Sequence, residues 1–328
     1  MSRYARALAI VGPTAAGKSA LALRLAEQLK LPLLSCDSVQ VYRGLDIGSA
    51  KASEAERARV RHELIDLVDP DQDFSANDYA RLARAQLEQG PGIFCGGTGL
   101  YLRAAGWSHS GSESEPGPRS DDHAQAPLPD HGPEREHFEA QWMAEQARQL
   151  GAIHAELARR DPETAATIHP NNVVRSLRAL WLCERHRAPI SEVRRRDPMR
   201  AVLDIMMLVV DPGVAAVDAA IEARCEAMLT RGWVAEVEKL LAEGYDGRYK
   251  SMRSLGYREV LDYLQGRASL PQTQAAIIRA TRKYARRQRT YFRHQFRQLL
   301  AMERIVTIDH PDACPTERVT AFLRGQSQ

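Results

Sequence analysis

The residues from Gly12 to Ser19 combine types and spacing suited to binding a phosphate group. Their sequence, Gly-Pro-Thr-Ala-Ala-Gly-Lys-Ser, matches the P-loop pattern Gly-x-x-x-x-Gly-Lys-Ser. In this pattern backbone N–H groups converge on phosphate oxygens, the lysine adds a positive charge, and the serine hydroxyl suits Mg²⁺. The motif predicts a diphosphate or triphosphate site with Ser19 as a Mg²⁺ ligand, and a glycine-rich turn is the alternative. The residues expected to form the site are Gly12, Thr14, Ala15, Ala16, Gly17, Lys18 and Ser19.

The flanks of this loop have the structure that phosphate binding needs. The apolar run at 7–11 predicts a buried strand, and Leu21, Leu25 and Leu29 recur at helical spacing. A strand, a glycine loop and a helix in this order bring the positive N-terminal end of the helix to the phosphate. The loop does not identify the reaction, because kinases, nucleotide hydrolases and transferases with a diphosphate leaving group all fit it.

Three polar residues outside the loop are candidates for the chemistry. Asp37 follows an apolar run at 31–36 and suits a general base or a Mg²⁺ ligand acting through water, although a turn or helix-capping aspartate fits the spacing equally well. Thr98 follows two glycines, which either admit a ligand close to the backbone or form a tight turn. Arg224 lies on an expected helix, from which it either reaches a diphosphate or stays at the surface.

The elements that must position these residues alternate between strand and helix in the first third of the chain. Apolar runs at 7–11, 31–36 and 92–95 predict strands, and Ser75 begins a capping-box pattern for a helix that ends near Gln89. Such alternation predicts an α/β fold with a P-loop-type parallel sheet flanked by helices. Active groups are then expected at the carboxyl ends of the strands.

The composition changes between Gly106 and Gly132, where Ser, Gly, Pro, His and Asp replace aliphatic residues, as is typical of a flexible linker. From about 133 to 200 the period is helical, with helix starts at Asp161-Pro162 and after His169-Pro170, and 202–210 returns to strand character. We therefore predict a P-loop catalytic core formed by 1–106 and 201–328, with basic helices near its C-terminus. A flexible linker plus a helical insertion domain would occupy 107–200.

A basic segment without acidic residues extends from Tyr263 to Met302. Since the whole chain carries a net charge of only +3, the rest of it is acidic. Aromatic residues lie between the arginines, and the lack of acids removes the usual ion-pair partners one helical turn away. The segment indicates contact with a nucleic acid, and a solvated helix face is the alternative. Its basic residues are Arg267, Arg279, Arg282, Lys283, Arg286, Arg287, Arg289, Arg293 and Arg297.

The composition excludes several other classes of protein. Hydrophobic residues make up 44% and charged residues 27% of the chain, as in globular proteins. No stretch approaches the roughly 18 apolar residues of a membrane span. The five cysteines show neither Cys-x-x-C spacing nor clustering with histidine. Cys36 and Cys95 are expected to be small buried hydrophobes. These features favour a reducing, cytoplasmic location, and nothing indicates an obligate dimer.

Further motifs stand in order along nearly the whole chain. They are Asp37-Ser38-Val39-Gln40-Val41-Tyr42-Arg43-Gly44-Leu45-Asp46-Ile47-Gly48-Ser49-Ala50-Lys51, His62 with Leu64-Ile65-Asp66, Gly96-Gly97-Thr98-Gly99-Leu100-Tyr101, Ile168-His169-Pro170-Asn171-Asn172 with Arg175 and Arg178-Ala179-Leu180, Gly256-Tyr257-Arg258-Glu259, and Thr281-Arg282-Lys283-Tyr284-Ala285-Arg286-Arg287-Gln288. Together with the P-loop, they make the chain resemble the tRNA dimethylallyltransferase family, also called tRNA isopentenyltransferase.

The resemblance implies transfer of a dimethylallyl group from dimethylallyl diphosphate to N6 of the adenosine immediately 3′ of the tRNA anticodon, with release of diphosphate. It implies that Lys18, Ser19 with Mg²⁺, and Arg224 stabilise the leaving diphosphate. Asp37 would accept the proton of the exocyclic amine, and Thr98 would contact the nucleotide flipped out of its stack.

The resemblance also implies a set of residues that contact the anticodon stem-loop. The insertion domain and the basic segment would hold the RNA through phosphate contacts and stacking. The implied set is Asp37, Ser38, Val39, Gln40, Thr98, Arg135, Arg175, Arg178, Arg253, Arg258, Arg286, Arg287 and Arg293. The expected partners are therefore dimethylallyl diphosphate and the tRNA anticodon stem-loop, with Mg²⁺ as cofactor, no membrane, and a monomeric enzyme.

Three other functions share some of these features. A small-molecule P-loop kinase has the same loop and sheet, but it does not need the acid-free segment and should show a lid rich in arginines. An adenylate prenyltransferase performs the same chemistry on a free nucleotide and needs no RNA grip. A nucleotide-gated RNA-binding switch would bind a nucleoside triphosphate without any transfer.

Overall fold

The computed structural model describes residues 4–109, 132–296, 299 and 302–325. Most of the linker predicted at 106–132, together with Arg297, lies outside these residues. The chain divides into two compact units. Unit 1 comprises Met1–Trp107 and Ala201–Gln328, and unit 2 comprises Ser108–Arg200.

A six-stranded parallel sheet forms the centre of unit 1, with strand order β3-β2-β4-β1-β7-β8. The register pairs Ala7 of β1 with Gly92 of β4 on one side and with Ile205 of β7 on the other. The predicted parallel sheet is confirmed. Its strands are β1 (Ala7–Val11), β2 (Leu33–Ser35), β3 (His62–Glu63), β4 (Gly92–Cys95), β7 (Ile205–Val210) and β8 (Ile305–Ile308).

Sequence patterns found the inner strands and missed the edges of the sheet. The edge strands β3 and β8 were not predicted, since β3 has only two residues and β8 is mostly half-buried or exposed. Strand β7 begins at Ile205, later than the predicted start at 202. A second, two-stranded sheet pairs β5 (Trp107–Ser108) with β6 (Arg200–Ala201).

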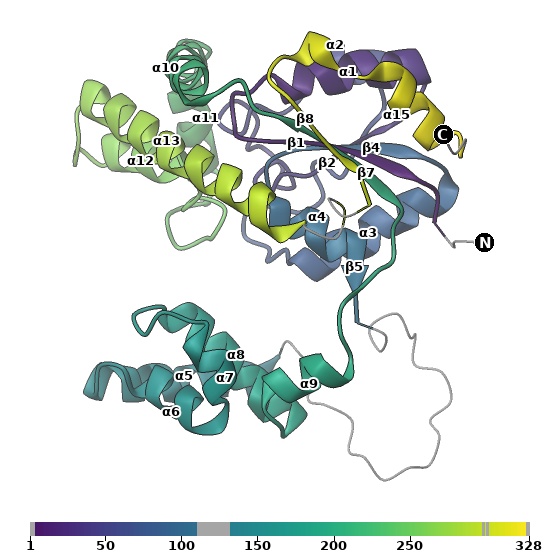
Figure 1. Ribbon diagram of the computed structural model, residues 1–328. Coiled ribbons are helices and arrows are strands. Elements are labelled where there is room, and N and C mark those ends of the chain that lie inside the picture. The colour runs from purple at the N-terminus through teal and green to yellow at the C-terminus, as the bar shows by residue number, and fades with distance from the viewer. Residues whose placement is uncertain (1–3, 110–131, 297–298, 300–301, 326–328) are drawn as a thin grey trace. The chain divides into compact units, whose positions relative to one another are not determined.

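Helices cover both faces of the six-stranded sheet, as Figure 1 shows. On one side, apolar side chains of α1 and α15 join those of the strands in a buried cluster that includes Leu8, Leu21, Leu25 and Met206. The other face carries α3 and α4 (Figure 1). The predicted helix start at Ser75 is confirmed as a capping box with Asp78. The bounds are α1 (Lys18–Leu29), α2 (Glu54–Arg59), α3 (Ala76–Gln89), α4 (Gly99–Gly106) and α15 (Thr316–Leu323).

Four further helices gather beyond the carboxyl ends of the strands (Figure 1). They are α10 (Val214–Thr230), α11 (Trp233–Ala242), α12 (Tyr257–Leu264) and α13 (Leu270–Gln295). The basic segment therefore lies mainly on α13, a single long helix. Its position brings side chains from late in the sequence to the edge of the sheet where the P-loop begins.

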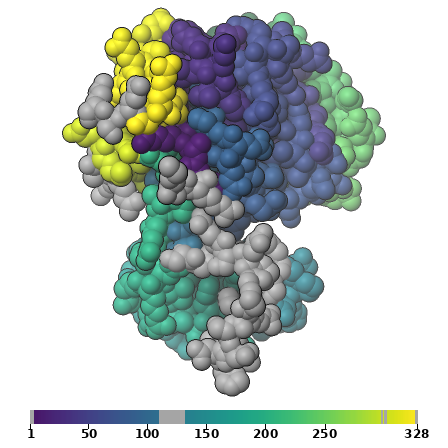
Figure 2. All heavy atoms as spheres, turned by 90° about the vertical axis from the view of Figure 1, so that its right-hand side faces the viewer, coloured from purple at the N-terminus to yellow at the C-terminus, as the bar shows by residue number. Residues whose placement is uncertain are grey.

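The C-terminal segment packs against the start of the chain. Arg6 donates a hydrogen bond to the carbonyl of Phe322 at 2.8 Å, and Arg24 of α1 pairs at 2.8 Å with Asp312 in the 3₁₀ turn η2 (Pro311–Ala313). Figure 2 shows this segment in yellow beside the purple N-terminal residues. These contacts hold the C-terminal segment against the residues before β1 and against helix α1.

Apart from Ser108 of β5 and Arg200 of β6 at its ends, the regular structure in the described part of unit 2 is helical, as its sequence period predicted. Its own buried cluster includes Ile153, Leu157 and Leu180. The buried carboxylate of Asp161 accepts hydrogen bonds from the backbone of Thr164 and of Ser191, and so caps α7 and the start of α9. The helices are α5 (Pro133–Arg148), α6 (Ala152–Arg160), α7 (Pro162–Ala166), α8 (Val173–His186) and α9 (Ile190–Arg196).

No helix in the described part of the chain is both long enough and apolar enough to cross a membrane.

Candidate active site

The P-loop joins β1 to α1 in the conformation that its glycines allow. Gly17 caps α1 with a φ of +84°, in the left-handed region that favours glycine. Gly12 has a φ of +141°, and a Cβ there would lie 2.2 Å from the carbonyl oxygen of Val210 on β7. Both positions therefore require glycine, because the loop turns sharply and passes close to the neighbouring strand.

Lys18 begins helix α1 and is buried, with its ammonium group donating to the Pro13 carbonyl at 2.6 Å. Burial lowers the pKa of Lys18 to about 8, with the nearby Arg224 adding to the effect and Cys95 and Asp37 opposing it. A buried lysine that is largely protonated at neutral pH is well suited to receive an anionic ligand.

Asp37 and Thr98 follow the adjacent strands β2 and β4, so the parallel sheet brings them to the same edge as the P-loop. Oδ1 of Asp37 accepts hydrogen bonds from the N–H groups of Val39 at 2.8 Å and Gln40 at 3.4 Å. Among the described residues, its Oδ2 has no hydrogen-bond partner. The Thr98 hydroxyl accepts the Ser38 N–H at 3.1 Å. Asp37 thus shapes a turn and keeps one carboxylate oxygen open.

Arg224 of α10 lies beside the P-loop, and its predicted contact with a diphosphate stays a prediction. Its guanidinium lies 3.3 Å from the Thr14 hydroxyl. Burial lowers its pKa, against the effect of Asp37, which raises it. The half-buried Arg224 and the buried Lys18 together place two positive charges next to the phosphate loop.

A cavity of about 320 Å³ lies between the P-loop, the loop after β2 and helices α10, α11 and α13. Its walls are mixed: the polar side chains of Asp37, Arg224 and Arg287 face the apolar Ile221 and Met228. The cavity is lined by Thr14, Ala15, Asp37, Ser38, Val39, Gly48, Ser49, Ile221, Arg224, Cys225, Met228, Trp233, Ser254, Leu255, Ile277, Thr281, Tyr284 and Arg287. Such a cavity suits an organic group attached to an anion.

A second cavity of about 140 Å³ lies on the P-loop side and includes Lys18 and Ser19. The two cavities share Thr14, Asp37, Ser49, Arg224 and Tyr284. Burial and the charge of Asp37 raise the pKa of Tyr284 to about 12, so its phenol stays neutral. The shared wall means that groups bound in the two cavities would meet beside Asp37.

Two cysteines lie close to this wall, and neither is an activated thiol. Burial raises the pKa of Cys36 to about 12 and that of Cys95 to about 11. Cys36 is buried, as predicted, whereas Cys95 remains half-buried. Both thiols are protonated at neutral pH and act as small packing residues.

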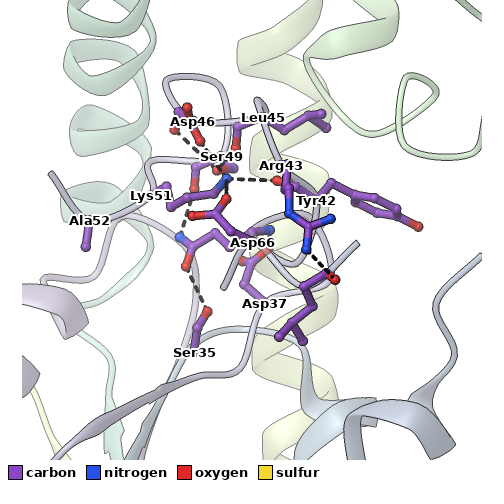
Figure 3. A network of polar contacts seen from close by, with 12 residues as sticks. Ser35, Asp37, Tyr42, Arg43, Leu45, Asp46, Ser49, Lys51, Ala52 and Asp66 are labelled. Carbon is purple, nitrogen blue, oxygen red and sulfur yellow. Dashed lines mark hydrogen bonds and ion pairs between the residues drawn. The ribbon is translucent and has the colours of Figure 1, made fainter. Parts of the chain in front are cut away.

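A polar network holds the loop that follows Asp37 (Figure 3). The buried ammonium of Lys51 donates to the Tyr42 carbonyl at 2.8 Å and pairs with Asp46 at 2.5 Å and Asp66 at 2.6 Å. Gln40 accepts from Ser35 at 2.8 Å and donates to the carbonyls of Ser49 and Ala50. Gln40, predicted to contact RNA, therefore has a structural role in fixing this loop.

Helix α11 also holds this loop. The N–H groups of Asp46, Ile47 and Gly48 all donate to the carboxylate of Glu236, at 3.0, 2.6 and 3.1 Å. A Cβ at Gly48 would lie 2.0 Å from the indole nitrogen of Trp233. This contact explains the glycine in the motif that follows Asp37, a role that sequence inspection did not assign.

Sequence reasoning also missed Gln288 of α13. This buried side chain accepts the Thr14 N–H at 2.8 Å and donates to the Gly97 carbonyl at 2.9 Å. The only signal in the sequence was its place at the end of the motif that begins at Thr281.

The acid-free basic segment finds acidic partners on other elements. Arg282 pairs with Asp218 and Glu222 of α10, Arg286 lies 3.8 Å from Asp218, and Arg289 binds Asp211. The segment has no acidic partner one helical turn away, as the sequence indicated, but acids on other elements pair with part of it, so it is not unpaired as a whole. Arg287 and Arg293 are exposed, and neither forms an ion pair with a described residue.

The other residues expected to face RNA are spread over both units. In unit 1, Arg253 is exposed and Arg258 pairs with Glu259 at 2.6 Å. In unit 2, Arg175 is exposed on α8, Arg178 is half-buried, and Arg135 pairs with Glu139 at 2.7 Å on α5. Their placement leaves an RNA role open to test.

Comparison with known proteins identifies the relatives of this chain. The family model described as IPP transferase matches residues 40–295. A tRNA dimethylallyltransferase of Sorangium cellulosum is 41% identical over 294 residues, covering 88% of each chain. Another, from a Roseiflexus species, is 43% identical over 296 residues, covering 87% of this chain and 89% of the relative.

Comparison with solved structures identifies relatives of the same kind. The full-length tRNA isopentenylpyrophosphate transferase of Bacillus halodurans is similar with a TM-score of 0.63 and 29% identity, covering 98% of this chain and 97% of that one. A eukaryotic dimethylallyltransferase acting on tRNA shares the fold with a TM-score of 0.77 at 20% identity, covering 98% and 80% of the two chains. A kinase is not favoured by any of these matches. The chain therefore belongs to the IPP transferase family, together with the tRNA dimethylallyltransferases.

Proposed function

We propose that this protein transfers a dimethylallyl group from dimethylallyl diphosphate to N6 of the adenosine immediately 3′ of the anticodon in tRNA. The observation that carries the proposal is the wall shared by the two cavities. One cavity offers Lys18 and Ser19 to a diphosphate, the other has room for a base, and Asp37 lines both. The relatives' names give tRNA and the dimethylallyl group, which support this choice of substrates.

In the proposed reaction the exocyclic amine attacks the first carbon of the dimethylallyl group. The C–O bond breaks, and the diphosphate leaves with the electron pair. Lys18 and Arg224 stabilise the negative charge that develops on this leaving group, because Lys18 is buried, Arg224 is half-buried, and both are already held beside the phosphate loop. Loop N–H groups beside them add to this field, except that of Thr14, which already donates to Gln288.

We further propose that Mg²⁺ accompanies the diphosphate at Ser19. Ser19 is exposed at the start of α1 and lines the same cavity as Asp37, so oxygen donors of the kind that Mg²⁺ prefers are present. Mg²⁺ usually takes only one or two protein ligands and completes its shell with phosphate oxygens and water, which suits this small donor set. When bound, the ion would neutralise charge on the diphosphate.

Asp37 accepts the proton that the amine loses as the new C–N bond forms. The turn holds its Oδ1 in place through the N–H groups of Val39 and Gln40, which leaves Oδ2 for the proton. Thr98 contacts the flipped nucleotide or its phosphate from the neighbouring loop. We assign the remaining contacts with the stem-loop to Ser38 and Val39 at the cavity and to arginines of both units. These are Arg135, Arg175, Arg178, Arg253, Arg258, Arg286, Arg287 and Arg293.

The proposal includes a monomeric enzyme in the cytoplasm. All five cysteines are free, which fits a reducing compartment. Unit 1 contains both cavities without any contribution from a second copy. The catalytic core at 1–106 with 201–328 and the RNA-contacting insertion at 107–200 would then act within one chain.

Mass spectrometry of an unmodified anticodon stem-loop tests the proposal. After incubation with the protein, Mg²⁺ and dimethylallyl diphosphate, we expect one dimethylallyl group on the adenosine 3′ of the anticodon. A stem-loop with guanosine at that position is the matched control and should stay unmodified. Absence of product from folded protein, or product on free adenosine monophosphate alone, would refute the proposed reaction.

A further inference from the structure

Helix α13 contacts the loops that follow three strands of the sheet. Gln288 bonds to Thr14 after β1 and to Gly97 after β4, while the next residue, Arg289, binds Asp211 after β7 at 2.6 Å. One turn of a single helix therefore touches the phosphate loop, the loop that carries Thr98, and the start of the connection to α10. No other polar side chain on α13 bridges two of these loops among the described residues.

The bridge made by Gln288 depends on both ends of its amide group. The amide oxygen accepts from Thr14 at 2.8 Å, and the amide nitrogen donates to Gly97 at 2.9 Å. Gln288 is buried, so these bonds do not compete with bulk water. A Cβ at Gly97 would lie 2.0 Å from that amide nitrogen, so the Gln288 side chain packs directly against the Gly97 backbone. A shift of α13 along or around its axis would move or break both bonds.

The same turn of α13 carries the surface assigned to RNA. Arg287 directly precedes Gln288, is exposed, lines the larger cavity, and has its guanidinium 5.8 Å from the ring centre of Tyr284. Arg293 is exposed further along the helix. A polyanion bound to these arginines would fix the position of α13, and thereby the position of Gln288.

We propose that Gln288 is a positioning residue that couples the binding of the two substrates. With the stem-loop on α13, its amide holds the phosphate loop and the Thr98 loop in the geometry that receives dimethylallyl diphosphate. Each substrate then strengthens the binding of the other by the same factor, as linkage requires. The inference rests on the proposed function, since it assumes that α13 contacts the RNA.

Binding measurements with an unreactive substrate analogue test this coupling. The affinity of dimethylallyl S-thiolodiphosphate is measured by calorimetry with and without a saturating anticodon stem-loop. We expect the stem-loop to tighten binding of the analogue on the order of tenfold in the natural protein. In Gln288→Met, which keeps the side-chain length but removes the amide, each ligand should still bind alone, while the coupling factor falls close to one.

Gln295→Met is the matched control, because Gln295 lies on the same helix, is exposed, and among the described residues has a hydrogen bond from Arg103 alone. It should keep the full coupling factor, whereas a merely structural loss in Gln288→Met would lower stability and leave coupling unchanged. Independent binding in the natural protein, or full coupling in Gln288→Met, would overturn the inference. A stem-loop that is modified yet binds without coupling would refute only this inference, whereas a stem-loop that does not bind would refute the proposed function as well.

Hydrogen exchange supplies a second measurement if Gln288→Met does not fold. The Thr14 amide of the natural protein donates to Gln288, so stem-loop binding alone should slow its exchange several-fold. Unchanged exchange at Thr14 in the presence of bound stem-loop would contradict the coupling without any substitution.

Discussion

Asp37 uses its two carboxylate oxygens differently. Oδ1 closes a turn through the N–H groups of Val39 and Gln40, and Oδ2 remains available at the wall between the cavities. The sequence left two interpretations of Asp37 open, a turn residue and a general base. Because its two oxygens are used differently, one side chain can serve in both ways. Any substitution that tests catalysis has to preserve the turn.

Asp37→Asn meets this condition, because the amide oxygen can still accept both N–H groups while the proton acceptor is lost. We expect the single-turnover rate of transfer to fall by about 10²–10⁴, with stem-loop affinity unchanged. Rapid-quench assays and a binding titration measure the two quantities. Asp71→Asn, at an exposed position, is the matched control, and a rate in Asp37→Asn equal to that control would remove Asp37 as the base.

Lys18 predicts a specific pH dependence. Its pKa of about 8 lies below the ordinary value of 10.5 because of burial, so the ammonium loses its proton as pH rises through about 8. We expect kcat/KM for dimethylallyl diphosphate to fall above that pH by roughly tenfold per pH unit, since kcat/KM reports the free enzyme. Lys18→Met should have a low kcat/KM at every pH and should not show the decrease at alkaline pH. If the variant kept that decrease, another group would be responsible for it.

The lowered pKa of Lys18 also affects the stability of the fold. This effect allows a loss of function in a Lys18 variant to be distinguished from a loss of folding. Between about 8 and 10.5 the unfolded chain binds more protons at Lys18 than the folded one, so stability rises with pH in this window. Below it, burial of the charged lysine opposes folding. Lys18→Met should therefore unfold at the same temperature as the natural protein or higher, while losing diphosphate affinity.

At the scale of elements, the loop between Asp37 and Lys51 is held from two sides. Lys51 and Gln40 fix it from within, and Glu236 of α11 binds three successive N–H groups of it and the hydroxyl of Tyr257 at 2.8 Å. A carboxylate that accepts four hydrogen bonds orders the loop and, through it, the wall of the larger cavity.

Glu236→Gln should weaken this clamp, because the new NH₂ group faces backbone donors. We expect a loss of about 1–3 kcal/mol in the free energy of unfolding, measured by urea denaturation. Glu238→Gln, on the exposed side of the same helix, should change little. Equal stability of the two variants would show that the three N–H groups find other acceptors.

How far the sequence predicts this site depends on the range of the contacts. The positions of Gly12, Lys18 and Asp37 follow from local patterns, since a strand end and a helix start determine where they lie. Gln288 and Glu236 act on residues far away in the chain, at separations of 274 and 190 positions. No local period encodes such contacts, and the acidic partners of the basic helix were missed for the same reason.

The pairing of α13 with α10 sorts its arginines into two groups. Arg282 already has Asp218 and Glu222 as partners, whereas Arg287 and Arg293 have no ion pair with a described residue. Replacing Arg287 and Arg293 with glutamine should lower the slope of log affinity against log salt by about one per arginine. Titrations of the stem-loop across salt concentrations measure it. Arg282→Gln is the control, and an equal slope in both variants would return α13 to a solvated face.

At the scale of the whole molecule, the two units have separate cores. The cluster around Leu8 and Leu25 contains only residues of unit 1, and the cluster around Leu157 and Leu180 only residues of unit 2. Both cavities belong to unit 1. This division predicts that diphosphate binding and the stem-loop contacts of Arg175 and Arg178 can be lost separately.

Substitution of Asp161 offers a way to separate diphosphate binding from stem-loop binding. It is fully buried in unit 2, and although burial opposes its charge, hydrogen bonds from Thr164 and Ser191 lower its pKa. Its contribution to stability is therefore present above the ordinary carboxyl pKa and disappears as pH falls below about 4. Asp161→Ala leaves those donors unpaired and should destabilise unit 2 by about 1–3 kcal/mol.

We expect Asp161→Ala to unfold in two steps, with unit 2 melting first. Between the two transitions, circular dichroism should show lost helix while calorimetry finds unchanged affinity for dimethylallyl diphosphate and several-fold weaker binding of the stem-loop. Glu163→Gln, which removes only an exposed ion pair with Arg195, should melt like the natural protein. A single transition in which diphosphate and stem-loop affinity fall together would mean that unit 1 needs a folded unit 2, and the division of labour between the units would be wrong.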